Sequence, residues 1–387
     1  MLPSLLNLWP ATLAFFTPAS APWMTGATYW LLGIVLGILI TAWIVGRALR
    51  QQPESTINPA VVKAFNKRVT AWWLIFAVLV AALITPTPQP TIALFFLVSF
   101  WGLREFITMT PTRRGDHRAL FWSFFLFTPL QYLLIGFSGA YPNLYGVYTI
   151  MIPVYASLFI PARIAFSGDA KRFLERSAKI QAGLLICVYS LSHAPALLQL
   201  ELQIRNPDHQ LATSAQNVAA VTEEAQPTPE KAAAVATESA TKEPEPKFVA
   251  WSGSRPGLLF YFILITQIGD LFQYLWGKLL GKHVIAPAIN ASRTWEGFVL
   301  GVLSTAMVGT LLWWVTPFQI WESTLMSAAI ALMGFAGGMT MSAIKRDRGV
   351  RDYGTLVQGH AGVLDRIDSI CFAAPVFFHL TRFLYGV

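Results

Sequence analysis

Acidic, basic and glycine residues gather in one segment near the C-terminus, between positions 342 and 368. Asp365 and Asp368 stand three residues apart in it, so they share one face if a helix begins there. Mg²⁺ in proteins usually binds one or two carboxylates and completes its coordination with water and substrate phosphates. The two aspartates therefore predict a magnesium site that acts on a phosphorylated substrate.

The same segment carries groups suited to phosphate. Lys345, Arg346 and Arg351 belong to the residue types that bind phosphate groups in proteins. Three glycines would allow backbone amides to approach an anion closely. They are Gly354, Gly359 and Gly362.

A plainer interpretation of this segment is also open. Charged loops are common beside membranes, Asp365 could cap the last helix, and Arg366 could extend toward anionic lipid headgroups. The combination of paired carboxylates, three glycines and His360 in one segment favours the functional interpretation.

A second group of polar residues lies upstream, from Asp270 to Gly297. Asp270 falls inside an apolar segment long enough to be a membrane helix, where an ionisable side chain is costly and is a functional candidate by default. The alternative is an ion pair with Lys278, about two helical turns away, that only stabilises the helix end.

Membrane helices must position both groups. Of the 387 residues, 55% are hydrophobic and only 12% are charged, which argues against an ordinary soluble enzyme. Charged residues are absent before Arg47, between Arg68 and Arg104, and between Arg118 and Arg163, and each gap exceeds the roughly 20 apolar residues that span a bilayer. We therefore expect an all-α polytopic membrane protein with about ten transmembrane helices. The predicted spans are 27–46, 69–85, 90–109, 119–138, 145–163, 180–199, 257–276, 297–315, 324–343 and 368–386.

A polar stretch divides these spans into six and four. Residues 201–256 are rich in Ala, Thr, Glu, Gln and Pro and poor in aromatic residues, a composition that cannot bury enough surface to fold. We expect a disordered extracytoplasmic loop there, between an N-terminal bundle at 1–200 and a catalytic membrane domain at 257–387. Cys187 and Cys371 both lie in apolar stretches and indicate neither a disulfide framework nor a thiolate metal site.

The distribution of basic residues predicts the orientation. If the N-terminus lies outside, most of the 28 Lys and Arg residues fall in loops on the inner side and the short outer loops carry none, as the positive-inside rule requires. This accounts for the net charge of +8 without a nucleic acid partner. Both polar groups then face the cytoplasm, and we expect an integral protein of a bacterial inner membrane.

By these residues the sequence resembles the CDP-diacylglycerol synthase family, also called phosphatidate cytidylyltransferases. The resemblance rests on the family's pattern S-x-x-K-R-x-x-x-x-K-D-x-G-x-x-x-P-G-H-G-G-x-x-D-R-x-D and, upstream, on D-x-x-x-Y-x-x-G-x-x-x-G-K-H and K-T-W-E-G. The long pattern is matched by Ser342, Lys345, Arg346, Asp352, Gly354, Gly359, His360, Gly362, Asp365, Arg366 and Asp368. The upstream elements are matched by Asp270, Tyr274, Gly277, Gly281, Lys282, His283, Thr294, Trp295, Glu296 and Gly297. The similarity is strong over residues 257–387.

Several positions depart from the family's pattern. Arg351 and Arg293 stand where the family usually has Lys, Gln358 where it has Pro, and Ala361 where it has Gly. Gly338 stands where the family has an Asp that the resemblance implies as a metal ligand, in a stretch that usually reads G-D-x-x-E-S. Since the basic residues and the Gly-His segment remain, the resemblance favours an active, divergent enzyme.

The resemblance implies transfer of a cytidylyl group from CTP to phosphatidic acid, giving CDP-diacylglycerol and pyrophosphate. It implies Mg²⁺ as the cofactor, bound by Asp365, Asp368 and Asp270. The catalytic residues it implies are Lys345, Arg346, Arg351, Asp352 and His360, and the substrate-binding residues are Ser342, Gly359, Gly362, Arg366, Lys278, Lys282, Ser292 and Thr294. Membrane lipids surround such a protein, and relatives of the family suggest a homodimer.

Three alternatives stay open. Another phosphorylated lipid could accept the cytidylyl group. The departure at Gly338 is compatible with an inactive relative that binds lipid or another enzyme. A transporter would also have about ten spans and intramembrane charges, here Arg104, Glu105 and Asp270, but its binding site should lie between repeated halves, and no repeat relates the six-span part to the four-span part.

Overall fold

The computed structural model describes residues 23–51, 59–109, 112–205, 247–350 and 362–386, and these residues are largely helical. Within these ranges nine helical segments are long and apolar enough to cross a membrane. The remaining predicted span, 297–315, is also helical, as α14 (Trp295–Leu311), but its 17 residues make it shorter than the other nine. The expected all-α polytopic membrane fold is therefore confirmed.

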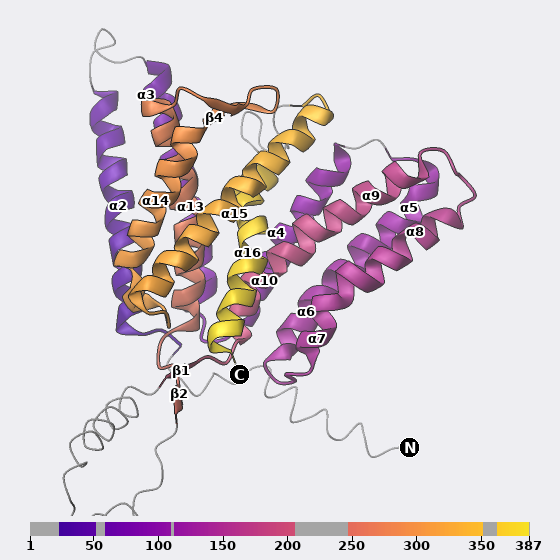
Figure 1. Ribbon diagram of the computed structural model, residues 1–387, viewed down its shortest axis with the longest axis horizontal. Coiled ribbons are helices and arrows are strands. Elements are labelled where there is room, and N and C mark those ends of the chain that lie inside the picture. The colour runs from indigo at the N-terminus through magenta and orange to yellow at the C-terminus, as the bar shows by residue number, and fades with distance from the viewer. Residues whose placement is uncertain (1–22, 52–58, 110–111, 206–246, 351–361, 387) are drawn as a thin grey trace, which may run out of the picture.

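In the described part of the N-terminal half there are six spans (Figure 1, indigo to magenta). The first three are α2 (Gly26–Arg50), α3 (Pro59–Ile84) and α4 (Gln89–Thr108). Each of the next three is built from two helices in sequence. They are α5 (His117–Trp122) with α6 (Thr128–Ser138), α7 (Leu144–Ile150) with α8 (Ser157–Ala165), and α9 (Phe173–Gly183) with α10 (Leu191–Ala196).

One wider, π-helical turn joins the two helices of each later span. These turns cover Ser123–Phe127, Met151–Ala156 and Leu184–Ser190. A proline lies inside or shortly after each of them, namely Pro129, Pro153 and Pro195. Because proline lacks an N–H and its ring crowds the carbonyl one turn earlier, we attribute the local widening to these prolines, and the helix then continues in the same span.

Four α-helices and a β-hairpin make up most of the described part of the C-terminal half (Figure 1, orange to yellow). The first helix, α13 (Arg255–Leu280), leads into an antiparallel hairpin of β3 (Val284–Ala286) and β4 (Asn290–Thr294). Helix α14 follows the hairpin directly. The last two helices are α15 (Ile320–Asp347) and α16 (Leu364–Tyr385).

Glycines allow the helices of this half to pack closely, as is common between membrane helices. A Cβ on Gly297 of α14 would lie 2.8 Å from the Gly277 nitrogen in α13. A Cβ on Gly337 of α15 would lie 2.6 Å from the Asp368 carbonyl oxygen in α16. These helices therefore meet through their backbones, which brings their polar residues within reach of one another.

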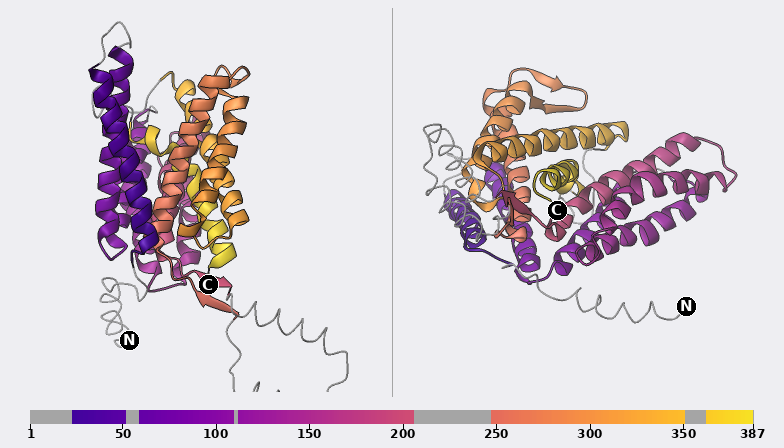
Figure 2. Two further views of the ribbon diagram at one scale, coloured as in Figure 1. Left: turned by 90° about the vertical axis from the view of Figure 1, so that its left-hand side faces the viewer. Right: turned by 60° about the horizontal axis from the view of Figure 1, so that its bottom comes forward.

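Helix α16 lies between the other C-terminal helices and the N-terminal half (Figure 2, right). It packs against α13 and α15 on one side and against α4 and α10 on the other. Phe377 of α16 stacks on Phe262 of α13 with ring centroids 5.1 Å apart, and both side chains are buried. The N-terminal bundle is thus part of the packing that holds the helix bearing Asp365 and Asp368.

The hairpin and the carboxyl end of α15 lie at one end of the bundle, and the C-terminus lies at the other (Figure 1). Near the C-terminus, β1 (Gln203–Arg205) pairs antiparallel with β2 (Phe248–Ala250). The loop expected to be disordered over 201–256 is therefore structured at both of its ends, because these strands pair and α13 begins at Arg255. The middle of that loop, 206–246, lies outside the described residues.

Candidate active site

The two polar groups predicted from the sequence meet at the hairpin end of the bundle. The Asn290 side chain of β4 donates a hydrogen bond to Ser342 Oγ in α15 at 3.1 Å, across 52 residues of sequence. Arg346 Nε, about one turn further along α15, donates to the Ile289 carbonyl of the hairpin at 3.1 Å. Ser342 itself donates to the Gly338 carbonyl at 2.7 Å. Two side chains of α15 therefore fix the hairpin in place.

Asp270 of α13 and Asp368 of α16 form the acidic centre of this region, which we call the Asp270–Asp368 pair. The two carboxylates interact electrostatically. The buried Ser369 hydroxyl donates to Asp368 Oδ1 at 3.4 Å and also interacts with Asp270. The Ser369 N–H also donates to Asp368 Oδ1 at 2.8 Å. Ser369 is thus a neighbour of both carboxylates.

The cation beside this pair is Arg293 of β4. Its Nη2 lies 3.4 Å from Asp270 Oδ1, and its Nη1 donates to Gln273 Oε1 at 2.8 Å. The alternative pairing of Asp270 with Lys278 is wrong: the ion pairs among the described residues include Asp270 with Arg293 but not with Lys278. The reason is geometric, since eight residues place Lys278 about 12 Å further along the helix. Lys278 is exposed in the last turn of α13.

Lys345 and Asp365 form an ion pair with each other. Lys345 Nζ donates to Asp365 Oδ1 at 2.6 Å, and the two side chains are only 16% and 9% exposed. A carboxylate expected to bind the metal thus holds a lysine expected to bind the triphosphate. Asp365 still acts electrostatically on Asp368, one turn further along α16.

Glu105 of α4, outside both groups, fixes the start of α16. Its carboxylate accepts hydrogen bonds from the backbone N–H groups of Val363 at 3.1 Å and Leu364 at 2.8 Å, and the residue is 3% exposed. N–H groups at the start of a helix have no partner within it, and the helix dipole favours a negative charge there. The sequence shows Glu105 only as an intramembrane charge. It does not reveal the partners of Glu105, because they lie 258 or more residues away.

Besides Ser342, three of the predicted substrate ligands have structural contacts. Thr294 is buried and caps α14, since its Oγ1 accepts the Gly297 N–H at 3.1 Å. Lys282 is exposed, and its backbone N–H donates to the Glu296 carboxylate at 3.1 Å, which holds the turn between α13 and β3. Ser292 is exposed on the hairpin, where its hydroxyl donates to Asn290 Oδ1 at 2.7 Å.

The remaining predicted residues lie at or within a gap in the described structure. Gly362 is buried just before α16, and Arg366 lies in its first turn. The predicted residues within 351–361 lie outside the described residues. They are Arg351, Asp352, Gly359 and His360.

The donor set fits a magnesium ion held jointly with substrate phosphate. Among the described residues, no three His, Cys, Asp or Glu side chains are grouped so that they could share a metal ion. The Asp270–Asp368 pair supplies two carboxylates, which matches the one or two that Mg²⁺ usually takes when phosphates complete its coordination. The magnesium site stays a prediction, with Asp365 engaged by Lys345 rather than grouped with the pair.

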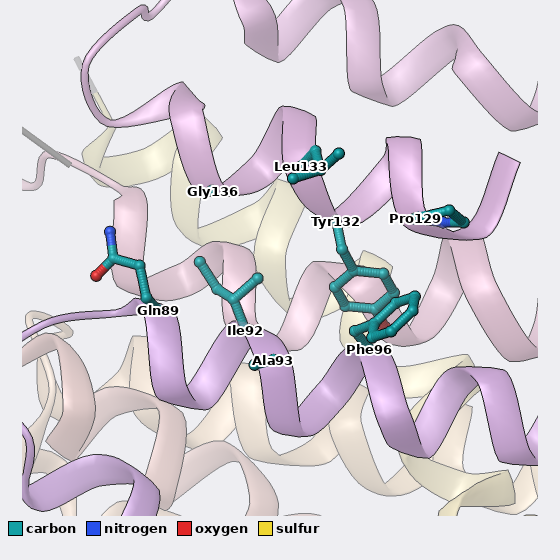
Figure 3. Close-up of a pocket in the computed structure, with 8 residues that line it drawn as sticks. All are labelled: Gln89, Ile92, Ala93, Phe96, Pro129, Tyr132, Leu133 and Gly136. Atoms are coloured by element: carbon teal, nitrogen blue, oxygen red, sulfur yellow. The ribbon is translucent and has the colours of Figure 1, made fainter. Parts of the chain in front are cut away.

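A separate cavity of about 320 Å³ lies between α4 and α6 (Figure 3). Its walls are mainly apolar side chains such as Ile92, Phe96 and Leu133. None of the described residues that line it is charged. A triphosphate needs cationic side chains, so this cavity does not suit a nucleotide, and the polar residues around the Asp270–Asp368 pair remain the candidate active site.

The sequence is similar to known proteins over most of its length. The model of the Cytidylyltransferase family matches residues 66–384. An Escherichia coli (strain K12) protein named "Uncharacterized protein YnbB" is 30% identical over 358 residues, which cover 91% of this chain and 97% of that protein. A protein named "Phosphatidate cytidylyltransferase" from Staphylococcus haemolyticus is 33% identical over 120 residues, 30% of this chain and 46% of its own length. Another of that name from Rickettsia bellii is 33% identical over 131 residues, 32% of this chain and 56% of its own length, so the chain spans about half of these two relatives.

Proposed function

Because the chain belongs to the cytidylyltransferase family, we propose that it transfers a cytidylyl group from CTP to phosphatidic acid. The products are CDP-diacylglycerol and pyrophosphate. The observation that carries this proposal is the meeting of α13, the hairpin, α15 and α16 around the Asp270–Asp368 pair, with Lys345 and Arg346 on α15. Carboxylates for Mg²⁺ and cations for a triphosphate are what nucleotidyl transfer requires.

The reaction is a displacement at phosphorus. A phosphate oxygen of phosphatidic acid forms a bond to the α-phosphorus of CTP, the bond from that phosphorus to the bridging oxygen breaks, and pyrophosphate leaves with the electron pair. The attacking phosphate is already ionised at neutral pH, so no side chain has to remove a proton, and we assign His360 as a hydrogen-bond donor. The protein's part is positioning and charge neutralisation.

We assign Asp270 and Asp368 to Mg²⁺, with Asp365 as the third candidate ligand. When bound, Mg²⁺ would neutralise charge on the triphosphate. Lys345, oriented by Asp365 at 2.6 Å, and Arg346 would bind triphosphate oxygens. Further contacts to the substrates are assigned to Arg351, Asp352, Gly359, Gly362, Arg366, Lys278, Lys282 and Ser292. We assign Ser342 and Thr294 to holding the hairpin and α14.

The hairpin end of the bundle is proposed to face the cytoplasm of a bacterial inner membrane, where CTP is available. The support is the positive-inside rule. The carboxyl end of α2, with Arg47 and Arg50 in its last turn, lies at the same end as the hairpin (Figure 1). A phosphatidic acid headgroup in the inner leaflet would then lie at the depth of the site. The homodimer suggested by the resemblance stays a prediction.

Another phosphorylated lipid is the second candidate acceptor. The chain matches 97% of the Escherichia coli protein, but only 46% and 56% of the two phosphatidate cytidylyltransferases. The part of this chain that selects the acceptor lipid can therefore differ from the corresponding part of the two phosphatidate cytidylyltransferases.

Purified protein in lipid nanodiscs, given Mg²⁺ and CTP labelled at the α-phosphate, tests the proposal. Phosphatidic acid and other phosphorylated lipids are compared as acceptors. Equal amounts of pyrophosphate and labelled lipid with phosphatidic acid support the proposal. Labelled lipid with a different acceptor alone supports the second candidate. Absence of pyrophosphate with every acceptor contradicts both and favours an inactive lipid-binding relative.

A further inference from the structure

Arg293 occupies the space beside the Asp270–Asp368 pair. Its Nη2 lies 3.4 Å from Asp270 Oδ1, and its charge also acts on Asp368. A Cβ on Gly338 of α15 would lie 3.2 Å from the same Nη2 and 3.9 Å from Asp368 Oδ2. The guanidinium therefore packs where position 338 has no side chain, and a larger residue there would displace it.

The guanidinium is held in this position by two helices. Its Nη1 donates to Gln273 Oε1 of α13 at 2.8 Å, and the Gln273 amide donates to the Ala331 carbonyl of α15 at 3.1 Å. Gln273 is 3% exposed and the Arg293 side chain is 18% exposed. The guanidinium carbon also lies 5.6 Å from the centre of the Phe335 ring. A positive charge is thus fixed next to two carboxylates.

A fixed cation changes what these carboxylates bind. The guanidinium already neutralises part of their charge, and a divalent ion that enters the pair is repelled by it. Because the side chains are largely withdrawn from water, salt and solvent screen this repulsion less than at the protein surface. The pair should therefore bind a divalent ion weakly by itself.

We infer that Arg293 is the resident cation of the Asp270–Asp368 pair and that it makes binding of the divalent ion depend on the nucleotide. The triphosphate brings negative charge that offsets the guanidinium, so the ion and CTP bind more tightly together than either does alone. By linkage, each tightens the binding of the other by the same factor. The inference rests on the proposed placement of Mg²⁺ and CTP at the pair, but not on turnover.

The test is Mn²⁺ binding to the purified full-length protein in detergent, followed through the electron paramagnetic resonance signal of free Mn²⁺ without nucleotide. We expect Arg293→Gln to bind Mn²⁺ at least about tenfold more tightly than the unchanged protein, because one repelling charge is removed. Arg293→Lys keeps the charge and should stay within about threefold of the unchanged protein. Asp368→Asn in the Arg293→Gln background should abolish the gain.

CTP supplies a second readout. Addition of CTP, with Mn²⁺ bound to CTP in solution accounted for, should tighten Mn²⁺ binding more in the unchanged protein than in Arg293→Gln. Arg293→Met keeps the packing against Phe335 and should reproduce the Arg293→Gln result. If Arg293→Gln melts at a clearly lower temperature than the unchanged protein, Arg293→Met replaces it in the Mn²⁺ comparison.

Equal or weaker Mn²⁺ binding by both Arg293→Gln and Arg293→Met would overturn the inference. The same gain in Arg293→Lys, or no Mn²⁺ binding by any variant, would also overturn it. A purely structural role of Arg293 predicts weaker binding in the variants, not tighter. If CTP is turned over while these affinities are unchanged, the proposed function stands and the inference fails. If the variants bind Mn²⁺ more tightly but CTP is not turned over, the inference stands and the proposed function fails.

Discussion

Replacement of Glu105 removes the carboxylate with which α4 caps α16. Glu105 is 3% exposed and accepts the N–H groups of Val363 and Leu364 at 3.1 and 2.8 Å. A hydrogen bond to a charged group contributes about 1.5–3 kcal/mol, so Glu105→Ala should destabilise this contact by about 3–6 kcal/mol. Glu105→Gln keeps one acceptor oxygen and leaves one buried N–H without its acceptor, so it should cost about 2 kcal/mol.

Each variant lowers the free energy needed to open the first turn of α16 by the amount of stability that it loses. A loss of about 2 kcal/mol corresponds to about thirtyfold faster exchange of the Val363 and Leu364 amide hydrogens. Hydrogen–deuterium exchange of the peptide that contains both residues measures this directly. Because the turn carries Asp365 and leads to Asp368, kcat should fall by at least about tenfold while KM for CTP changes less, and Glu105→Asp should recover part of the rate.

Glu322→Gln is the matched control. Glu322 lies in the first turn of α15, at the opposite end of that helix from the site, and accepts the Gln319 N–H at 2.8 Å. Its replacement should leave exchange at Val363 and Leu364 unchanged. Unchanged exchange of these two amides in Glu105→Ala would refute the reasoning, because their hydrogen bonds to Glu105 would then contribute nothing.

Three further tests probe the rest of the geometry. Lys345→Ala and Asp365→Ala each remove the 2.6 Å ion pair between two largely buried side chains, so their losses of stability in denaturation should couple by about 1 kcal/mol or more in a double-mutant cycle. Gly337→Leu should separate α15 from α16 and lower both the melting temperature and the rate of cytidylyl transfer. Gly33→Leu should change neither, because a Cβ built on Gly33 has no atom within 4 Å. Thr294→Ala should cost about 1 kcal/mol in denaturation and leave KM for CTP unchanged, since Thr294 is a helix cap. Additive stability losses of Lys345→Ala and Asp365→Ala would contradict the first expectation. An unchanged melting temperature of Gly337→Leu would contradict the second, and a raised KM for CTP in Thr294→Ala would contradict the third.

Composition was sufficient to predict the membrane fold. Inside lipid the backbone polar groups must be paired within the segment, so long apolar segments become helices. The predicted span 27–46 is the helix Gly26–Arg50, and the predicted span 324–343 is the helix Ile320–Asp347. The pairing of Gln203–Arg205 with Phe248–Ala250 could not be predicted, because both strands are short and border a stretch whose composition indicates disorder.

The contacts within the site were less predictable than its position. Sequence spacing reports neighbours on one helix, and it correctly placed Asp365 and Asp368 one turn apart on α16. It could not show that Asp270 pairs with Arg293, because that contact joins a helix to a hairpin strand. The contact of Glu105 with the start of α16 joins residues even further apart in the chain. Such contacts depend on how the helices pack, which local patterns do not determine.

The central claim is that cytidylyl transfer depends on the Asp270–Asp368 pair. The most direct measurement compares CTP-dependent formation of labelled lipid by Asp270→Asn, Asp368→Asn and the control Asp347→Asn, each normalised to folded protein in nanodiscs. Asp347 is 67% exposed at the end of α15 and lies 2.8 Å from Arg348. We predict a loss of transfer of at least about 100-fold in the two variants of the pair and an unchanged rate in the control. Undiminished transfer in both variants of the pair would contradict the account.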